Sequence, residues 1–135
     1  MTPTHLPPAH YVPWDRPSPL LGAIGGFLHD PDDPCRFGFT VEEPKTNARG
    51  LLHGGVIATL GDVAIGSALA RQTDPPTPLV TVNLSCDLLG AARAGEWVEI
   101  VVSPTRVGRR LASGIATFST TRTIATVTGL FMPAA

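Results

Sequence analysis

Residues 53–72 read HGGVIATLGDVAIGSALARQ and form the one long segment of the chain with a helical pattern of apolar residues. Nearly every other position is small, and Asp62 carries the one charge within residues 56–70. A helix that is apolar almost all round is typical of a buried element. We therefore expect helix 53–72 to be the most buried part of the fold. The apolar stripe comprises Val56, Ile57, Leu60, Ala64, Ala68 and Leu69.

The segments on both sides of this helix have the alternation of strands. Before it, residues 22–29 and 36–43 predict a hairpin, with Phe37, Phe39 and Val41 on one face. Residues 44–52 predict a loop. After the helix we expect strands over 79–89, 96–107, 110–121 and 123–132. The alternation places four side chains on one face of the first of these strands: Val80, Val82, Leu84 and Cys86.

Two positions predict irregularities in these strands. Pro104 lacks a backbone donor, which indicates a bulge or an edge position. A short junction at Arg122 separates the last two strands and indicates a bulge rather than a turn.

The order of these elements predicts an α+β fold. Strands linked by hairpins make an antiparallel sheet, and one helix must cover one of its faces. We expect about five to six strands curled around the buried helix. Residues 1–19 hold six prolines and predict an extended arm, which Tyr11 and Trp14 could fasten to the domain. Residues 20–135 predict a single domain.

Composition excludes several classes of protein. The 135 residues are 43% hydrophobic with a formal net charge of −1, so neither a disordered chain nor a nucleic-acid-binding surface is indicated. No stretch is apolar enough to span a membrane, and no secretory signal is visible. Cys35 and Cys86 predict free thiols of a reducing compartment, and we expect a cytoplasmic protein. No His, Cys or Asp cluster has metal-ligand spacing.

The helix start and Asp62 are the candidates for chemistry. Gly54 and Gly55 are poor helix formers, but they suit a place where another group approaches the backbone. The first N–H groups of a helix can accept a carbonyl oxygen or an oxyanion. A plain structural turn explains the same motif. Asp62 is either a functional carboxylate or one that is hydrogen-bonded in the core or at a subunit contact.

The spacing of His53 and Asp62 constrains any site that they share. They are nine residues apart, which is about 13 Å along a helix and on opposite sides of it. One chain cannot bring both to one small molecule. Two antiparallel helices related by a two-fold axis can, so a shared site requires at least a dimer.

The pattern Asn47-x-x-Gly50-x-x-His53-Gly54-Gly55, followed by Thr59-Leu60-x-Asp62, resembles the hot-dog-fold acyl-CoA thioesterases. The branch that degrades phenylacetic acid is the most similar. Val80-Thr81-Val82-x-Leu84, the segment Ala92-Arg93-Ala94-Gly95 and Val107-Gly108-Arg109 agree with it. The resemblance covers about residues 20–132 and implies a homodimer, with a homotetramer of two dimers as the further expectation.

The resemblance also implies a role for each matching residue. The backbone N–H of Gly54 would polarise the thioester carbonyl, and Asp62 of the facing protomer would be general base or nucleophile. Asn47 would hold the attacking water or the thioester, and His53 would orient it. Thr81 matches a hydroxyl residue near the carboxylate. No cofactor is implied, because the coenzyme A thioester is itself the substrate.

Coenzyme A carries phosphates, for which arginine is the usual planar partner. The candidate residues for binding it are Gly55, Arg93, Arg106, Arg109 and Arg110. A solvated hairpin is the simpler explanation for the cluster of the last three. The acyl group stays open between aryl-acetyl and medium-chain acyl.

Three alternatives remain. A hot-dog hydratase or dehydratase resembles this chain in fold, but it usually places Asp and His together near the helix start. A non-catalytic acyl-CoA sensor usually carries an added helical domain. A dimer that has lost activity is the third.

Overall fold

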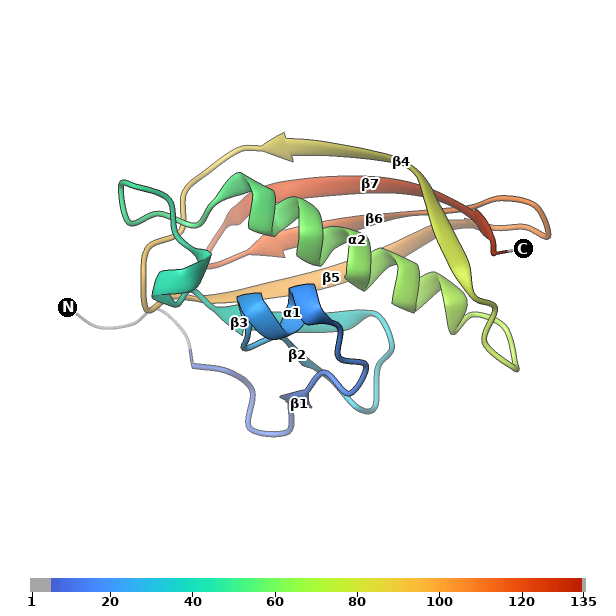
Figure 1. The fold of residues 1–135 in the computed structure, drawn as a ribbon, viewed down its shortest axis with the longest axis horizontal. Coiled ribbons are helices and arrows are strands. Elements are labelled where there is room, and N and C mark those ends of the chain that lie inside the picture. The colour runs from blue at the N-terminus through green and yellow to red at the C-terminus, as the bar shows by residue number, and fades with distance from the viewer. Residues whose placement is uncertain (1–5, 135) are drawn as a thin grey trace.

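The computed structural model describes residues 6–134, so residues 1–5 of the expected arm lie outside the described part. A seven-stranded antiparallel sheet curls around one long helix, α2 (Gly54–Ala70), as Figure 1 shows. The strand order is β1-β2-β3-β5-β6-β7-β4, which leaves β1 and β4 at the edges. The predicted α+β architecture is confirmed, with more strands than the five to six expected.

The bounds of the strands show how the sheet is built. Two of them have only two residues each, whereas the four that follow α2 are long. The strands are β1 (Val12–Pro13), β2 (Leu28–His29), β3 (Arg36–Thr40), β4 (Leu79–Leu88), β5 (Trp97–Val107), β6 (Ala112–Ser119) and β7 (Thr123–Pro133). A short helix α1 (Pro19–Ile24) and a 3-10 turn η1 (Glu43–Lys45) complete the chain.

Helix α2 begins and ends within two residues of the predicted bounds. Its sheet-facing side is buried, through Ile57, Leu60, Gly61, Ala64, Ile65, Ala68 and Leu69. The other side, which includes Thr59, Asp62, Val63 and Gly66, is only half-buried in the single chain. Complete burial of α2 therefore stays a prediction for an oligomer. No helix in residues 6–134 has the length and apolar character needed to cross a membrane.

The expected strand over 22–29 is wrong in its first half. Ser18 accepts a hydrogen bond from the N–H of Leu21 and caps α1, with Pro19 in the first turn. Gly25 and Gly26 then take φ values of +74° and +64°, which end the helix. Only β2 pairs with β3, so the predicted hairpin is confirmed in a shortened form. Phe37, Phe39 and Val41 are buried on one face as predicted.

The predicted common face of β4 is also wrong. Thr81 pairs with Phe131 and Asn83 pairs with Leu130, so Val82 is an extra residue that forms a bulge. Past the bulge the alternation changes face. Leu84 and Cys86 pack against the core, whereas Val80 and Val82 are 46% and 49% exposed.

The two other expected irregularities have different outcomes. The register of β5 against β6 shifts between Pro104 and Arg106, which confirms the predicted bulge. Residues 120–122 instead form a turn that joins β6 to β7, with the N–H of Thr120 donating to the carbonyl of Arg122 at 2.9 Å. The expected bulge at Arg122 is therefore wrong.

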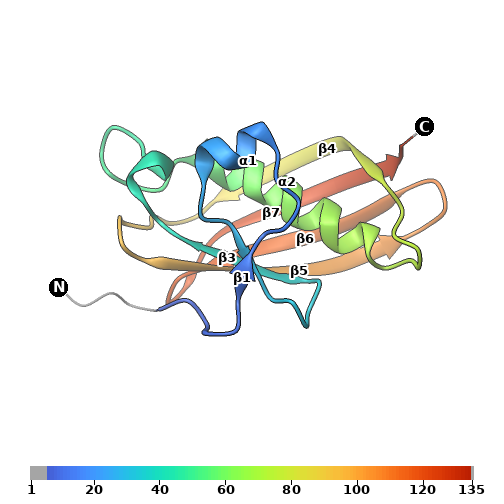
Figure 2. The ribbon, with the colours of Figure 1, turned by 60° about the horizontal axis from the view of Figure 1, so that its bottom comes forward.

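Tyr11 and Trp14 fasten the N-terminal segment to the sheet, as expected. The Tyr11 hydroxyl donates to Glu99 of β5. Trp14 lies against the rings of Phe27, His29 and Phe37. Figure 2 shows α1 near α2 on the same side of the sheet.

Candidate functional site

The loop before α2 is held by the side chain of Asn47. Its Oδ1 accepts hydrogen bonds from the N–H groups of Arg49 at 2.9 Å and Leu51 at 3.2 Å. This is the Asx-turn geometry that asparagine favours in loops. Because Oδ1 is committed to the loop, the Nδ2 amide is the part of Asn47 that can donate to another molecule.

His53 caps the N-terminus of α2. Its Nδ1 accepts from the N–H of Gly55 at 2.8 Å. The proton of the neutral ring is therefore on Nε2, which can donate outward from the exposed side chain. The Gly55 N–H is already paired, so it is a poor candidate for substrate binding. Gly54 is the first residue of the helix, and its N–H has no intrahelical partner.

Asp62 and Thr81 meet on the inner side of β4. The Thr81 hydroxyl donates to Oδ1 of Asp62 at 2.5 Å. No basic side chain in residues 6–134 forms an ion pair with this carboxylate. Oδ2 is consequently available to accept a proton from a water molecule or a substrate. The structure therefore brings together two of the predicted site residues that are distant in sequence.

The helix start and Asp62 remain apart within one chain. Gly54 and Asp62 are both on α2, eight residues apart, which corresponds to about 12 Å along the axis. The loop residues Asn47, His53 and Gly54 form one half of the candidate site, and Asp62 with Thr81 forms the other. A single chain does not unite these two halves.

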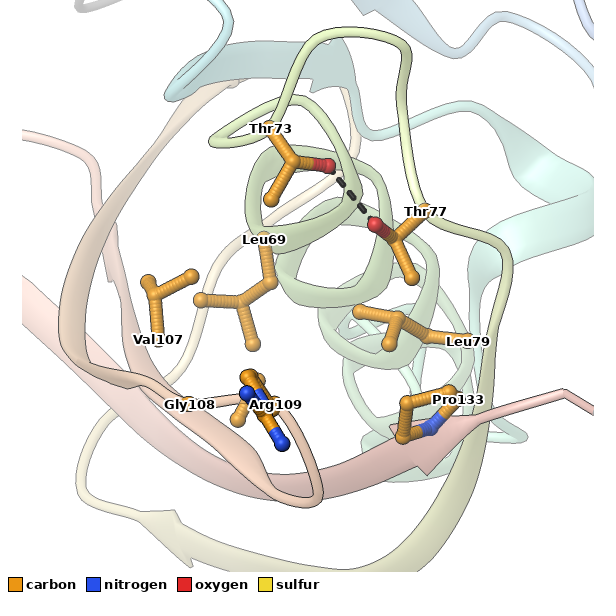
Figure 3. A pocket seen from close by; sticks show the side chains of 9 residues that line it. Leu69, Thr73, Thr77, Leu79, Val107, Gly108, Arg109 and Pro133 are labelled. Atoms are coloured by element: carbon orange, nitrogen blue, oxygen red, sulfur yellow. Dashed lines mark hydrogen bonds between the residues drawn. The ribbon is translucent and has the colours of Figure 1, made fainter.

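The four candidate arginines lie at two ends of the molecule. Arg93 is bridged to Leu51 beside the helix start. Arg106, Arg109 and Arg110 are in or next to the turn between β5 and β6, near the C-terminal end of α2. There Arg109 lines a cavity of about 300 Å³ together with Leu69 and Leu79, as Figure 3 shows. One protomer therefore does not assemble all four arginines around one ligand.

Both cysteines are free thiols in the structure, as predicted. Burial raises the pKa of Cys86, and nearby Asp87 raises it further. Burial likewise raises the pKa of Cys35. The protonated thiol is a weak nucleophile. Within residues 6–134 no group of His, Cys, Asp or Glu side chains is arranged to hold a metal ion.

Sequence reasoning missed two residues at the edge of this site. An ideal Cβ on Gly54 would lie 2.7 Å from Cδ1 of Leu88, which is itself 55% exposed. Lys45 is fully buried at the base of the loop that carries Asn47. Lys45 is the single lysine of the chain, which could have drawn attention to it. Nothing in its local sequence predicts that it is buried. No pattern in the sequence points to Leu88.

The chain is similar to proteins with known descriptions. A family model described as the thioesterase superfamily matches residues 49–115, which include the helix start, Asp62 and Thr81. A Pseudomonas aeruginosa protein that is named as a candidate esterase is 36% identical over 127 residues. That match covers 92% of this chain and 95% of the relative. Human acyl-coenzyme A thioesterase 13 is 39% identical over 72 residues, or 53% of this chain and 51% of its own length.

A similarity in fold extends the comparison to solved structures. The structure of a hypothetical thioesterase from Streptococcus pneumoniae, which contains coenzyme A, matches with a TM-score of 0.68. The match covers 84% of this chain and 85% of that one, at 18% sequence identity. At this identity the likeness concerns the fold alone.

Proposed function

Because the chain belongs to the thioesterase superfamily and has its hot-dog fold, we propose that it hydrolyses acyl-CoA thioesters. The substrate class is aryl-acetyl or medium-chain acyl-CoA, and the products are the free acid and coenzyme A. The name of the human relative and the coenzyme A in the Streptococcus pneumoniae structure support an acyl-CoA substrate, whereas the choice of acyl group rests on the family resemblance. No cofactor takes part in the proposed reaction.

The observation that carries the proposal is the pair of half-sites. The N–H of Gly54, which has no partner within the helix, offers a donor to the thioester oxygen at the positive end of the α2 dipole. Asp62 offers a carboxylate whose Oδ1 is fixed by Thr81 and whose Oδ2 is available. These groups are a carbonyl-polarising donor and a base or nucleophile, which are the requirements of acyl transfer to water.

The chemistry needs both half-sites at one thioester. Asp62 either takes a proton from water, whose oxygen adds to the carbonyl carbon, or attacks that carbon itself before water hydrolyses the resulting anhydride. In both routes the C–S bond breaks and the departing sulfur takes a proton. The Nδ2 amide of Asn47 and Nε2 of His53 would hold the thioester or the water beside Gly54. Arg93, Arg106, Arg109 and Arg110 are the proposed partners of the coenzyme A phosphates.

The same geometry supports a homodimer with two shared sites. In an antiparallel pair of α2 helices, Asp62 of one protomer would face the helix start of the other. Edge strand β4 exposes Val80 and Val82, and an unprotected apolar edge favours pairing with a second chain. Assembly of two dimers into a tetramer rests on the family resemblance.

Release of thiol from a panel of acyl-CoAs tests this function. The purified protein should release free coenzyme A, which a thiol-reactive chromophore detects, from aryl-acetyl or medium-chain substrates. The Asp62→Asn variant is the matched control, because it keeps the size and polarity of the side chain. Binding of acyl-CoA without thiol release would instead indicate a non-catalytic acyl-CoA-binding protein.

A further inference from the structure

Lys45 is the one lysine of the chain, and its side chain is completely buried. Its Nζ donates to Oε1 of Glu42 at 2.7 Å and lies 6.0 Å from the centre of the Phe39 ring. The Glu42 side chain is 56% exposed, so the carboxylate reaches inward from the surface to the ammonium. A buried ammonium is unfavourable unless it is paired, which makes this arrangement unusual.

The connection between α1 and β2 covers this ion pair. At Gly26, whose φ is +64°, an ideal Cβ would lie 2.5 Å from Oε1 of Glu42 and 3.0 Å from Nζ of Lys45. Any side chain at this position would therefore displace the pair. The absence of a Cβ lets the backbone pass directly over the two charged groups.

The backbone of Lys45 fixes the base of the loop that carries one half of the candidate site, formed by Asn47, His53 and Gly54. Its carbonyl accepts a hydrogen bond from the N–H of His53 at 2.9 Å, and its own N–H donates to Glu42 at 2.8 Å. The next residue, Thr46, forms a bridge with Leu52. The two ends of the loop thus meet at Lys45, directly before the Gly54 N–H.

We propose that Lys45 is a positioning residue for thioester hydrolysis, acting through the Lys45–Glu42 ion pair. The inference rests on the function proposed above. A charge-assisted hydrogen bond is short and directional. It therefore restricts the orientation of η1 and the loop base to a smaller range than apolar packing would. The loop base in turn sets where Asn47, His53 and Gly54 present their donors. A methionine would fill nearly the same space without this orientation.

The test compares Lys45→Met with a core variant outside the loop. Val102→Ala, in the buried part of β5, serves as that control because Val102 belongs to the core and lies four residues from Val98, the strand partner of Phe39. We expect Lys45→Met to lower kcat by about tenfold to a hundredfold, because a small misplacement of reacting groups has effects of that size. We expect KM to stay within about threefold and Val102→Ala to keep wild-type kcat.

Amide hydrogen exchange supplies a readout that does not depend on activity. In Lys45→Met the N–H groups of His53 and Gly55 should exchange faster, whereas the strand amides of β6 and β7 keep their protection. Wild-type kcat together with wild-type exchange at His53 would overturn the proposal. A fall in kcat that Val102→Ala reproduces at a similar loss of stability would also overturn it, because the effect would then be one of stability.

Two further outcomes separate this inference from the function on which it rests. Wild-type protein that releases no thiol contradicts the proposed function, and exchange at His53 still decides whether the ion pair orders the loop. If Lys45→Met does not fold, Glu42→Gln removes the charge of the surface partner and keeps an oxygen acceptor. Glu42→Gln should lower kcat, as Lys45→Met is expected to do. Unchanged kcat in Glu42→Gln would overturn the proposal.

Discussion

The hydroxyl of Thr81 and the carboxylate of Asp62 form a 2.5 Å hydrogen bond that joins β4 to α2. The bulge at Val82 makes this bond compatible with the packing of the rest of β4. Without the bulge, a strand that turned Thr81 toward α2 would also turn Asn83 and Ser85 inward. The extra residue lets the same strand direct Thr81 to Asp62 and pack Leu84 and Cys86 against the core.

Replacement of Asp62 by asparagine should remove most of the activity. The variant keeps an acceptor for the Thr81 hydroxyl but loses the base, so kcat for acyl-CoA should fall by about 10²–10⁴-fold. Circular dichroism and the unfolding midpoint should stay near those of wild type. Wild-type kcat in Asp62→Asn would mean that the carboxylate is structural.

Thr81→Val is the companion variant and should have a smaller effect. It leaves the carboxylate in place but removes the donor to Oδ1. Loss of a hydrogen bond to a charged group corresponds to roughly 1.5–3 kcal/mol, so kcat should fall by about tenfold to a hundredfold. Thiol-release kinetics should show this loss in kcat. Wild-type kcat in Thr81→Val would mean that the hydrogen bond to Asp62 does not assist the reaction.

The elements that follow from local pattern were predictable, and those that depend on distant residues were not. The 3.6-residue period identified α2, since small and apolar side chains continue on its sheet-facing side. Residues 22–24 were assigned to a strand because GAIGG is apolar, but the cap at Ser18 and the left-handed Gly25 make them helical. The bulge at Val82 is set by pairing with β7, which lies about fifty residues later.

The site was predictable in its residue types but not in its contacts. Asn47, His53 and Asp62 could be named because the motif has a recognisable spacing. The commitment of the Gly55 N–H to His53, and of Oδ1 of Asn47 to its own loop, appears only in the structure. Lys45 was missed because its burial depends on Gly26, which a local pattern around residue 45 does not include.

Substitution of Gly54 by alanine tests the close approach of Leu88 to the helix start. Alanine keeps the N–H and is the better helix former, so the stability should change by no more than about 1 kcal/mol. Its methyl would lie 2.7 Å from Cδ1 of Leu88, so that side chain must move. We expect kcat/KM to fall by about 10²-fold, because the displaced leucine narrows the space beside the donor.

The double variant Gly54→Ala/Leu88→Ala identifies the cause of that loss. Truncation of Leu88 removes the clash and should restore most of kcat/KM. Leu88→Ala alone is the matched control for any direct contact of this leucine with substrate. A double variant as slow as Gly54→Ala would instead show that the methyl itself blocks the thioester.

The pH dependence of stability should report the burial of His29. Its side chain is 6% exposed, and Nδ1 has no hydrogen-bond partner within residues 6–134. Burial lowers the pKa of His29, and Arg71 lowers it further, whereas Asp15 and Asp30 oppose the shift. The folded chain therefore keeps this ring neutral at a pH at which the unfolded chain protonates it.

The sign of the effect follows from proton uptake on unfolding. Below about pH 6.5 the unfolded state binds a proton that the folded state does not, so the free energy of unfolding falls with decreasing pH. The slope is at most about 1.4 kcal/mol per pH unit and vanishes again below the folded-state pKa of His29. Urea unfolding from pH 5 to 8 should show this slope in wild type and a shallower one in His29→Phe. Equal slopes would contradict the assignment.

A mixture of two inactive variants tests whether the half-sites come from different protomers. Asn47→Asp keeps an oxygen for the loop N–H groups of Arg49 and Leu51 but removes the Nδ2 donor. Asp62→Asn removes the base from the other half-site. Each variant alone should be nearly inactive, because every site in its homodimer carries the same defect.

Refolding the two variants together at equal concentration should restore part of the activity. If each site takes its loop from one protomer and Asp62 from the other, random assembly makes about a quarter of the sites intact. That fraction is the same for a dimer and for a tetramer of dimers, because each site still joins two chains. Refolding each variant alone is the control for recovery of the fold. A mixture that stays as inactive as its components would show that Asn47 and Asp62 act within one chain or at separate sites, and the shared site would be wrong.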